Sequence, residues 1–441
     1  MKPADADRPC RIGRVTIRAQ AVENDREPLS IDQATIPPAS NDPRASAWVA
    51  VILITLVQSV SACANVTLPT VAPKIADALG VDASWIGYQV SLLFGCAVLS
   101  ATFGGGMVAR LGPARTGQVA ALLCIVGMAL AALPSIATMA LSTLLCGFAL
   151  GLVNPGAAQV IVRFTPLRHR NLIFSVKQSG VPLGGVAVGL TAPLIAVSLG
   201  WQWSVLPAIV VAFAVLLLMQ WVHPLWDSER NREAKLFGSR SGGIGMVWRR
   251  PALRWLALSG FWFAFIQRSV MTFLVSYLYL VAGYSLVEAG ALLALYQAAG
   301  GLARPVWGIL ADRISGPPVL TGLSLCTIAT CIALFWLDGT WPPALVALIV
   351  GVLGATSYGW NGVYHAEATR ISPPREIATV TAGTSSFAYS GVLAGPALFA
   401  VGYQFSGSYP AMFGSLAGAA ALGLCCLLLA IRHARQAAAP A

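Results

Sequence analysis

One segment of the chain, residues 262–277 (WFAFIQRSVMTFLVSY), is apolar almost throughout but holds Gln267 and Arg268 side by side at its centre. A guanidinium does not lose its proton in a protein, so Arg268 stays cationic wherever it lies. An arginine at the centre of a membrane helix costs roughly 2.5–3.5 kcal/mol on insertion scales and faces a cavity or a partner in most cases. The pattern therefore predicts that Arg268 meets electron-rich groups of the protein or a bound anion.

Carboxylates are scarce along the rest of the chain. Only ten acidic residues follow position 45, and all fall near the ends of apolar segments: Asp77, Asp82, Asp227, Glu229, Glu233, Glu288, Asp312, Asp338, Glu367 and Glu376. Arg268 is thus expected to have no carboxylate at its own level. Its remaining partners are backbone carbonyls, water or an anionic substrate, and a purely structural, hydrogen-bonded arginine is the alternative.

The elements that position Arg268 are predicted to be membrane-spanning helices. The 441 residues are 57% hydrophobic and only 10% charged, and their mean hydropathy is +0.73, whereas soluble domains have about 25% charged residues. From about Trp48 onward, twelve apolar runs recur, and about 20 residues suffice to cross a hydrocarbon core of ~30 Å as a helix. We expect an all-α integral membrane protein with two pseudo-symmetric six-helix bundles.

The distribution of lysine and arginine predicts the orientation of the chain. The connections after even-numbered spans, together with the C-terminal segment, carry 17 basic residues, whereas the opposite loops carry Lys74 alone. Basic loops stay on the cytoplasmic side, so both termini are expected in the cytoplasm of a multi-pass protein of the cell (inner or plasma) membrane. This asymmetry explains much of the formal charge of +11, and no basic–aromatic pattern indicates nucleic-acid binding.

Composition also divides the chain into segments. Residues 1–45 are rich in Pro, Asp and Arg and are expected to form a disordered cytoplasmic tail. A polar, Gly- and Ser-containing stretch at 223–254 is expected to be a cytoplasmic linker between an N-terminal bundle, 46–222, and a C-terminal bundle, 255–431. Residues 432–441 are expected to form a short cytoplasmic tail.

The two bundles are predicted to be copies of one duplicated unit. Three motif pairs recur in the same order: GGMVARLG with GILADRIS, NPGAAQVIVRFTP with NGVYHAEATRISP, and SGVPLGG with SGVLAGP. The pair at Gly105 and Gly308 is offset by 203 residues. Subtracting this offset from Arg268 gives Asn65, so both residues are expected at corresponding depths, where a transporter built from two repeats would place a shared midplane site.

From about residue 46 to 431, these motifs resemble a twelve-helix transporter of the major facilitator superfamily. The signature of that family, between helices 2 and 3, is a glycine, an acidic and a basic residue, a second glycine and further basic residues. The resemblance implies gating loops with the following residues: Gly105, Arg110, Gly112, Arg115, Gly308, Asp312 and Arg313. Ala109 occupies the acidic position of the first copy, so the usual gating salt bridge is not expected there, and Ser315 replaces the second glycine of the other copy.

At a finer level the chain resembles cyanate- and nitroimidazole-type permeases and other organic-anion carriers, on the segments around Asn154 and Asn361. Its fifth span approximates the Gly-Pro-x-x-Gly-Gly motif of exchangers. The residues concerned are Gly180, Pro182, Gly184 and Gly185. Two of these glycines are four residues apart, a spacing that lets helices approach closely, so we expect this motif to serve helix packing.

Polar residues inside the spans form the predicted substrate-binding site. Besides Arg268, the candidates are Gln267, Asn65, Lys177, Gln178, Asn154, Asn361, Tyr358 and Tyr296. Lys177 can instead extend toward the inner interface, and each of the polar residues can instead form a hydrogen bond between helices. Arg304 is expected to act in a gate or in structure, and His365 to be a structural residue or a proton carrier.

These features predict a secondary active transporter that moves a small organic anion by alternating access, driven by proton symport or by exchange. A multidrug efflux transporter of the same superfamily is one alternative, and a non-transporting membrane sensor is another. No nucleophile, paired carboxylates or metal ligands occur at a shared depth, so we expect neither an enzyme nor a metal or other cofactor. The expected partners are the anionic substrate, protons and the lipid bilayer, and the chain is expected to be monomeric.

Overall fold

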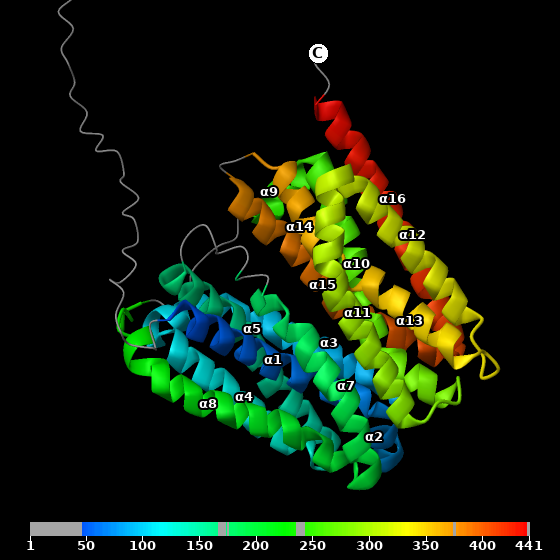
Figure 1. Ribbon diagram of the computed structural model, residues 1–441, viewed down its shortest axis with the longest axis horizontal. Coiled ribbons are helices and arrows are strands. Elements are labelled where there is room, and N and C mark those ends of the chain that lie inside the picture. The colour runs from blue at the N-terminus through cyan, green and yellow to red at the C-terminus, as the bar shows by residue number, and fades with distance from the viewer. Residues whose placement is uncertain (1–45, 166–172, 174–175, 235–242, 374–375, 439–441) are drawn as a thin grey trace, which may run out of the picture.

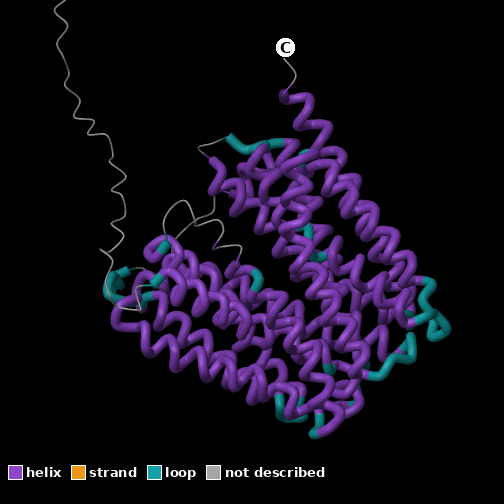
Figure 2. Tube along the Cα trace, viewed as in Figure 1, coloured by secondary structure: helices purple, strands orange, loops and turns teal. Residues whose placement is uncertain are grey.

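The computed structural model describes residues 46–165, 173, 176–234, 243–373 and 376–438. Within these residues every regular element is a helix, as Figure 2 shows. Twelve helical segments are long and apolar enough to cross a membrane. The predicted all-α architecture with twelve spans is confirmed, and the protein is a multi-pass membrane protein.

Each half of the chain contributes six spans and additional short helices (Figure 1). The first half contains α1 (Ala47–Thr70), α2 (Ala72–Leu79), η2 (Ala83–Trp85), α3 (Ile86–Leu111), α4 (Pro113–Ala131), α5 (Ile136–Phe164), α7 (Gly180–Ser198), η4 (Trp201–Val205) and α8 (Leu206–Trp226). The second half contains α9 (Gly243–Arg249), α10 (Pro251–Leu280), α11 (Leu286–Ile314), α12 (Gly316–Phe335), α13 (Pro343–Ser357), α14 (Asn361–Arg370), α15 (Ile377–Ser406) and α16 (Tyr409–Ala438).

Local sequence signals determine where several of these helices begin. Helices α4, α10 and α13 start at Pro113, Pro251 and Pro343, where the missing N–H of proline would have no partner in the helix anyway. Helix α11 starts with a capping box in which the Ser285 hydroxyl accepts the backbone N–H of Glu288 (3.3 Å) and the Glu288 carboxylate accepts that of Ser285 (2.9 Å).

The spans form two bundles that meet at one end and diverge at the other (Figure 1). The first bundle comprises α1–α8 and the second α10–α16, and they contact each other mainly through α7 with α11 and α3 with α15. We call the end where they converge, which carries α2 and η2, the α2 end, and the opposite end, which carries α9, the α9 end. The sequence predicts that the α9 end is cytoplasmic.

Helices extend into the segments that were expected to be linker and tail. Helix α8 continues to Trp226, α9 forms inside the linker, and α10 begins at Pro251. The segment 223–254, predicted as a cytoplasmic linker, therefore contains helical residues at both of its ends, and Trp226 at the end of α8 is buried. Helix α16 likewise continues to Ala438. The expected tail at 1–45 lies outside the described residues.

The tenth span is broken in its middle, which the sequence analysis did not anticipate. Helix α13 ends at Ser357 and α14 begins at Asn361. The indole N–H of Trp307 donates to the carbonyl oxygen of Ala355 (2.8 Å), which in a continuous helix would accept the N–H of Gly359. Discontinuous helices at membrane depth occur where the backbone is buried in protein or lines a cavity, and this break lies within the predicted site.

The two loops that are predicted to act in gating share one strained backbone position, which gives a stability prediction. Gly112 has φ +92° and ψ +162°, and its repeat partner Ser315 has φ +78° and ψ +159°, a region that is essentially restricted to glycine and costs other residues roughly 1–3 kcal/mol. Ser315→Gly is therefore expected to raise the free energy of unfolding by about 1 kcal/mol. Thermal unfolding of the purified protein in detergent measures this change.

The reverse substitution in the first copy is the matched control. A Cβ on Gly112 would lie 2.2 Å from the Asp227 carboxylate, so Gly112→Ser adds a steric clash to the backbone strain. We expect Gly112→Ser to lower the melting temperature markedly while Ser315→Gly raises it. A lower melting temperature for Ser315→Gly would contradict this account.

Candidate functional site

Arg268 lies on α10 of the second bundle and reaches across to α1 of the first. Its Nη2 donates to the side-chain oxygen of Asn65 at 2.9 Å, and the arginine is only 7% exposed. Asn65 is held in turn by a hydrogen bond from its amide nitrogen to the carbonyl of Ser61 (3.0 Å). The two residues that the repeat predicted at corresponding depths therefore form a polar bond between the two bundles.

The rest of the Arg268 guanidinium is only partly engaged by protein. Its Cζ lies 4.3 Å from the centre of the Phe94 ring, a cation–π contact, and its Nη1 lies 3.7 Å from the sulfur of Met271. Its Nε is buried without a hydrogen-bond partner among the described residues, and no described carboxylate forms an ion pair with it. Arg268 consequently retains donor capacity and uncompensated charge.

Two buried tyrosines of the second bundle lie in the same region as Arg268. Tyr296 on α11 and Tyr358 at the break in the tenth span are fully buried, with ring centres 5.9 Å apart, and both lie within electrostatic range of Arg268. The Tyr296 hydroxyl shares a hydrogen bond with Ser357 (3.0 Å). The guanidinium carbon of Arg304 lies 4.7 Å from the centre of the Tyr358 ring. Arg304 therefore lies against one ring of this pair.

Gln267 points to a different set of partners from its neighbour Arg268. Its side-chain oxygen accepts the indole N–H of Trp360 (2.8 Å) and the amide of Asn361 (3.4 Å). Successive helix residues point about 100° apart, so Gln267 is directed to α14 within its own bundle. Two predicted site residues, Gln267 and Asn361, are thus brought together. Their hydrogen bond links α10 to the start of α14, so both side chains are engaged with each other.

A third group lies in the first bundle. The Lys177 ammonium, which is 1% exposed, donates to the side-chain oxygen of Asn154 on α5 at 2.5 Å. No described carboxylate forms an ion pair with Lys177. Gln178 is exposed and makes no described side-chain hydrogen bond. The predicted site residues accordingly fall into three groups, and no described hydrogen bond joins the Lys177 pair to the Arg268 group.

Gln297 is a buried polar residue of this region that was not among the substrate-site residues predicted from the sequence. It is fully buried on α11, and both its amide nitrogen and its oxygen lack hydrogen-bond partners among the described residues. A Cβ on Gly185 would lie 1.8 Å from that nitrogen, so Gln297 inserts against α7 at the boundary between the bundles. Its spacing of seven residues from Arg304 is the signal that could have identified it.

The glycine motif of α7 has two faces. A Cβ on Gly180 or Gly184 would lie 2.6 or 2.7 Å from backbone oxygens of α1, in the same bundle. Gly185 and Pro182 instead face α11 of the other bundle, where they contact Gln297 and Gly301. The motif therefore allows close packing inside the first bundle and also between the two bundles.

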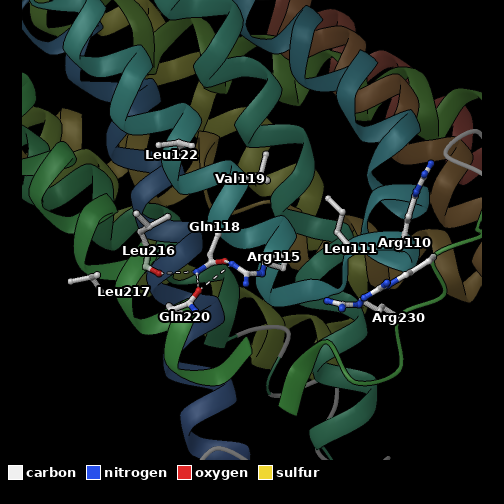
Figure 3. A pocket seen from close by; sticks show the side chains of 11 residues that line it. Arg110, Leu111, Arg115, Gln118, Val119, Leu122, Leu216, Leu217, Gln220 and Arg230 are labelled. Carbon is white, nitrogen blue, oxygen red and sulfur yellow. Dashed lines mark hydrogen bonds between the residues drawn. The ribbon is translucent and has the colours of Figure 1, made fainter. Parts of the chain in front are cut away.

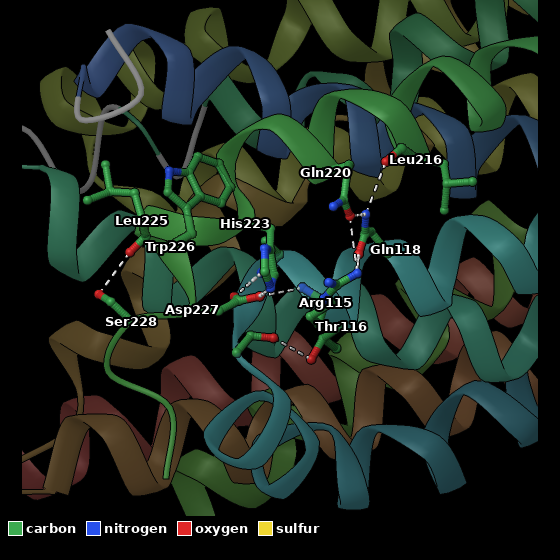
Figure 4. Close-up of polar contacts among 12 residues, drawn as sticks. Arg115, Thr116, Gln118, Leu216, Gln220, His223, Leu225, Trp226, Asp227 and Ser228 are labelled. Carbon is green, nitrogen blue, oxygen red and sulfur yellow. Dashed lines mark hydrogen bonds and ion pairs between the residues drawn. The ribbon is translucent and has the colours of Figure 1, made fainter. Parts of the chain in front are cut away.

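The first gating loop is stabilised by a carboxylate that does not come from the family signature. Asp227, just beyond α8, accepts the backbone N–H groups of Ala114 (2.8 Å) and Arg115 (3.0 Å) at the start of α4 (Figure 4). Burial raises the pKa of the Asp227 carboxyl, and these two donors, with the charges of His223 and Arg115, oppose the shift. Negative charge stabilises a helix N-terminus, so Asp227 stabilises the start of α4.

The second gating loop is arranged differently. Asp312 and Arg313 form no described ion pair, whereas the Glu367 carboxylate pairs with Arg370 (2.5 Å) and lies 3.1 Å from a Cβ placed on Gly316. A Cβ on Gly105 or Gly308 would meet nothing within 4 Å. Arg110 has no described hydrogen bond or ion pair. An acid at the end of α8 therefore caps the helix after the first loop, whereas the acid of α14 pairs within its own helix and lies close to Gly316 at the second loop.

Two bundles of six spans, an internal repeat and a buried cation between the bundles define the fold of a secondary transporter. The sequence profile of the Major Facilitator Superfamily matches residues 54–396. The chain belongs to this superfamily, and it is a transporter rather than an enzyme. Among the described residues, no group of three or more His, Cys, Asp or Glu side chains could hold a metal ion.

Curated relatives are distant in sequence. The 4-hydroxybenzoate transporter PcaK of Acinetobacter baylyi is 23% identical over 430 residues, which cover 88% of this chain and 88% of that protein. An uncharacterized MFS-type transporter of Mycobacterium tuberculosis is 24% identical over 316 residues, 68% of this chain and 67% of its own length. A galactose–proton symporter of Escherichia coli is 26% identical over 166 residues, 36% of this chain and 35% of its own.

Solved structures share the fold. The peptide transporter POT in complex with sulfate has a TM-score of 0.69 at 17% identity, over 88% of this chain and 95% of that one. A bacterial homologue of the human lysosomal transporter Spinster, in an inward-facing and occupied conformation, has a TM-score of 0.64 at 17% identity, over 87% and 94% of the two chains. At these identities the comparison establishes the fold alone.

Proposed function

We propose that this MFS transporter moves a small organic anion through the cell membrane by gradient-driven alternating access. The observation that carries the proposal is Arg268, a buried cation between the bundles that has an uncharged partner in Asn65, a free Nε and no described carboxylate. A charge in this setting is costly unless it is compensated. An anionic substrate would compensate it and would thereby be selected over neutral or cationic compounds.

An aromatic carboxylate is the substrate class that the surroundings favour. The Phe94 ring lies 4.3 Å from the Arg268 guanidinium carbon, and the Tyr296 and Tyr358 rings lie within electrostatic range of the same arginine. These rings could stack on a planar ring while the arginine binds the carboxylate. The relative from Acinetobacter baylyi that matches most of the chain is named for 4-hydroxybenzoate. Gln267, Asn361 and Gln178 are proposed to line the path at greater distance.

In the predicted orientation the α9 end, where the two bundles diverge (Figure 1), faces the cytoplasm. Both termini then lie in the cytoplasm, and one chain suffices to form the site. We propose a proton as the coupling ion, with buried Lys177 and half-buried His365 as the groups that could carry it, since the described carboxylates all lie near the ends of the spans. The named relatives include a galactose–proton symporter.

Reconstitution into lipid vesicles tests this function. We expect labelled 4-hydroxybenzoate to enter the vesicles faster when the outside is acidic, to saturate with concentration, and to be displaced by other small carboxylates. Vesicles without protein are the control. Transport of a lipophilic cation such as tetraphenylphosphonium without carboxylate uptake would instead support the efflux alternative, and carboxylate binding without any flux or counterflow would support a sensor.

A further inference from the structure

A cavity of about 750 Å³ lies on the outside of the first bundle, away from Arg268. It is formed by α3, α4, α8 and the segment just after α8, as Figure 3 shows. The lining residues lie on helices of the first bundle or in the segment just after α8, and none belongs to the candidate substrate site. The cavity lies toward the α9 end, where α3 ends and α4 begins.

Four arginines give this cavity a strongly positive rim. They are Arg110, Arg115, Arg230 and Arg232. Arg115 donates to the side-chain oxygens of Gln118 (2.8 Å) and Gln220 (3.1 Å), both uncharged. The other three arginines are exposed, and no described carboxylate lies within ion-pair distance of them. The rim therefore carries positive charge that the described protein does not neutralise.

The remaining wall is apolar and continuous with the membrane-facing surface. Leu122 on α4 is 52% exposed and Leu217 on α8 is 56% exposed, and both residues lie within spans. Exposed leucines at such depth contact acyl chains rather than water. A cavity that is cationic at the helix ends and apolar along the helices matches a molecule with an anionic headgroup and hydrocarbon chains.

We infer that this cavity is a binding site for an anionic glycerophospholipid of the leaflet at the α9 end. The phosphate would lie among the four arginines, and an acyl chain would lie along Leu122 and Leu217. Basic pockets between transmembrane helices bind anionic headgroups by this combination of charge and hydrophobic contact. A free phosphate would use only the rim, and a zwitterionic lipid would bring a positive group close to the arginines.

Native mass spectrometry of the delipidated full chain tests the site with phosphatidylglycerol, phosphatidylcholine and inorganic phosphate as probes. We expect the wild type to retain phosphatidylglycerol preferentially. In Arg230→Gln/Arg232→Gln the apparent affinity for that lipid should fall roughly 30-fold, as expected for the loss of two surface cations. The matched control is Arg432→Gln/Arg435→Gln, which removes two exposed arginines from α16 outside the cavity and should leave the affinity unchanged.

Photo-crosslinking of the wild type provides a readout that does not depend on a variant folding. A phosphatidylglycerol with a photoreactive acyl chain should label peptides from α4 and α8 that contain Leu122 and Leu217. Equal retention of phosphatidylcholine, an equal gain from inorganic phosphate, labelling confined to other helices, or equal losses in the two double variants would each overturn the proposal.

Discussion

Carboxylate uptake by the Arg268→Ala variant is expected to fall by about 100-fold, because a buried charge-assisted pair with the substrate is worth roughly 2–5 kcal/mol. Its melting temperature should stay the same or rise. Arg268 is 7% exposed, its hydrogen-bond partners Asn65 and Met271 are uncharged, and no described carboxylate pairs with it. Removing such a cation relieves a burial cost of roughly 2.5–3.5 kcal/mol on insertion scales, which offsets the lost contacts with Asn65 and Phe94.

This combination distinguishes a substrate-binding arginine from a structural one. If Arg268 were structural, its truncation to alanine would lower the stability of the protein, because its hydrogen-bond partners would be left unpaired. Arg268→Lys keeps the charge but loses the planar fork that binds a carboxylate with two hydrogen bonds. We expect Arg268→Lys to raise the KM for uptake while it retains part of the maximal rate. Vesicle uptake and thermal unfolding of the same preparations measure both quantities.

Asn65→Ala is the matched control, because it removes the other partner of the Arg268–Asn65 hydrogen bond. It removes the partner that holds Arg268 across the bundles but leaves the guanidinium available, so uptake should fall less than in Arg268→Ala. Wild-type uptake by Arg268→Ala would exclude a substrate contact. A clear drop in its melting temperature would show that the arginine is structural.

The spans and the Arg268–Asn65 pair could be predicted because each depends on information that is local or repeated in the sequence. A run of apolar residues long enough to cross the bilayer specifies a helix with little help from tertiary contacts. Equivalent positions of the two repeats are expected at the same depth in the membrane. The repeat offset of 203 residues therefore relates Arg268 to Asn65 from the sequence alone.

Contacts that depend on how helices rotate against each other could not be predicted. Lys177 and Asn154 are 23 residues apart in the sequence, and only the tertiary arrangement of their two segments brings the side chains into their 2.5 Å contact. The cap that Asp227 provides to α4 joins the end of α8 to a helix start more than a hundred residues earlier. Gln267 and Arg268 were grouped by adjacency, although helical geometry already directs neighbouring side chains apart.

The second prediction concerns two glycines of α7. Valine at Gly189 is expected to trap one conformation of the transporter, whereas valine at Gly184 is expected to destabilise the fold. A Cβ on Gly189 would lie 2.8 Å from the Gly290 carbonyl oxygen and 3.0 Å from the Ala294 nitrogen, both on α11 of the other bundle. A Cβ on Gly184 would lie 2.7 Å from the Ser59 carbonyl oxygen on α1 of the same bundle. Both backbone contacts are too close for any side chain.

Gly189→Val is expected to abolish transport without unfolding the protein. The clash exists only while the bundles are closed at the α2 end, so separation of the bundles at that end relieves it. A clash of about 3 kcal/mol moves a balanced two-state equilibrium more than 100-fold toward the separated state. The clash of Gly184→Val lies inside one bundle and no rocking motion relieves it, so overpacking of roughly 1–3 kcal/mol should appear as lost stability.

Pulsed electron paramagnetic resonance measures the separation directly. Spin labels on Leu199→Cys and Phe405→Cys, 66% and 88% exposed at the α2 ends of the two bundles, are introduced after replacement of the native cysteines. Gly189→Val should shift the distance distribution to longer values with little change in melting temperature, whereas Gly184→Val should lower the melting temperature. An unshifted distribution in a well-folded, transporting Gly189→Val protein would mean that the α7–α11 contact does not control access to the Arg268 site.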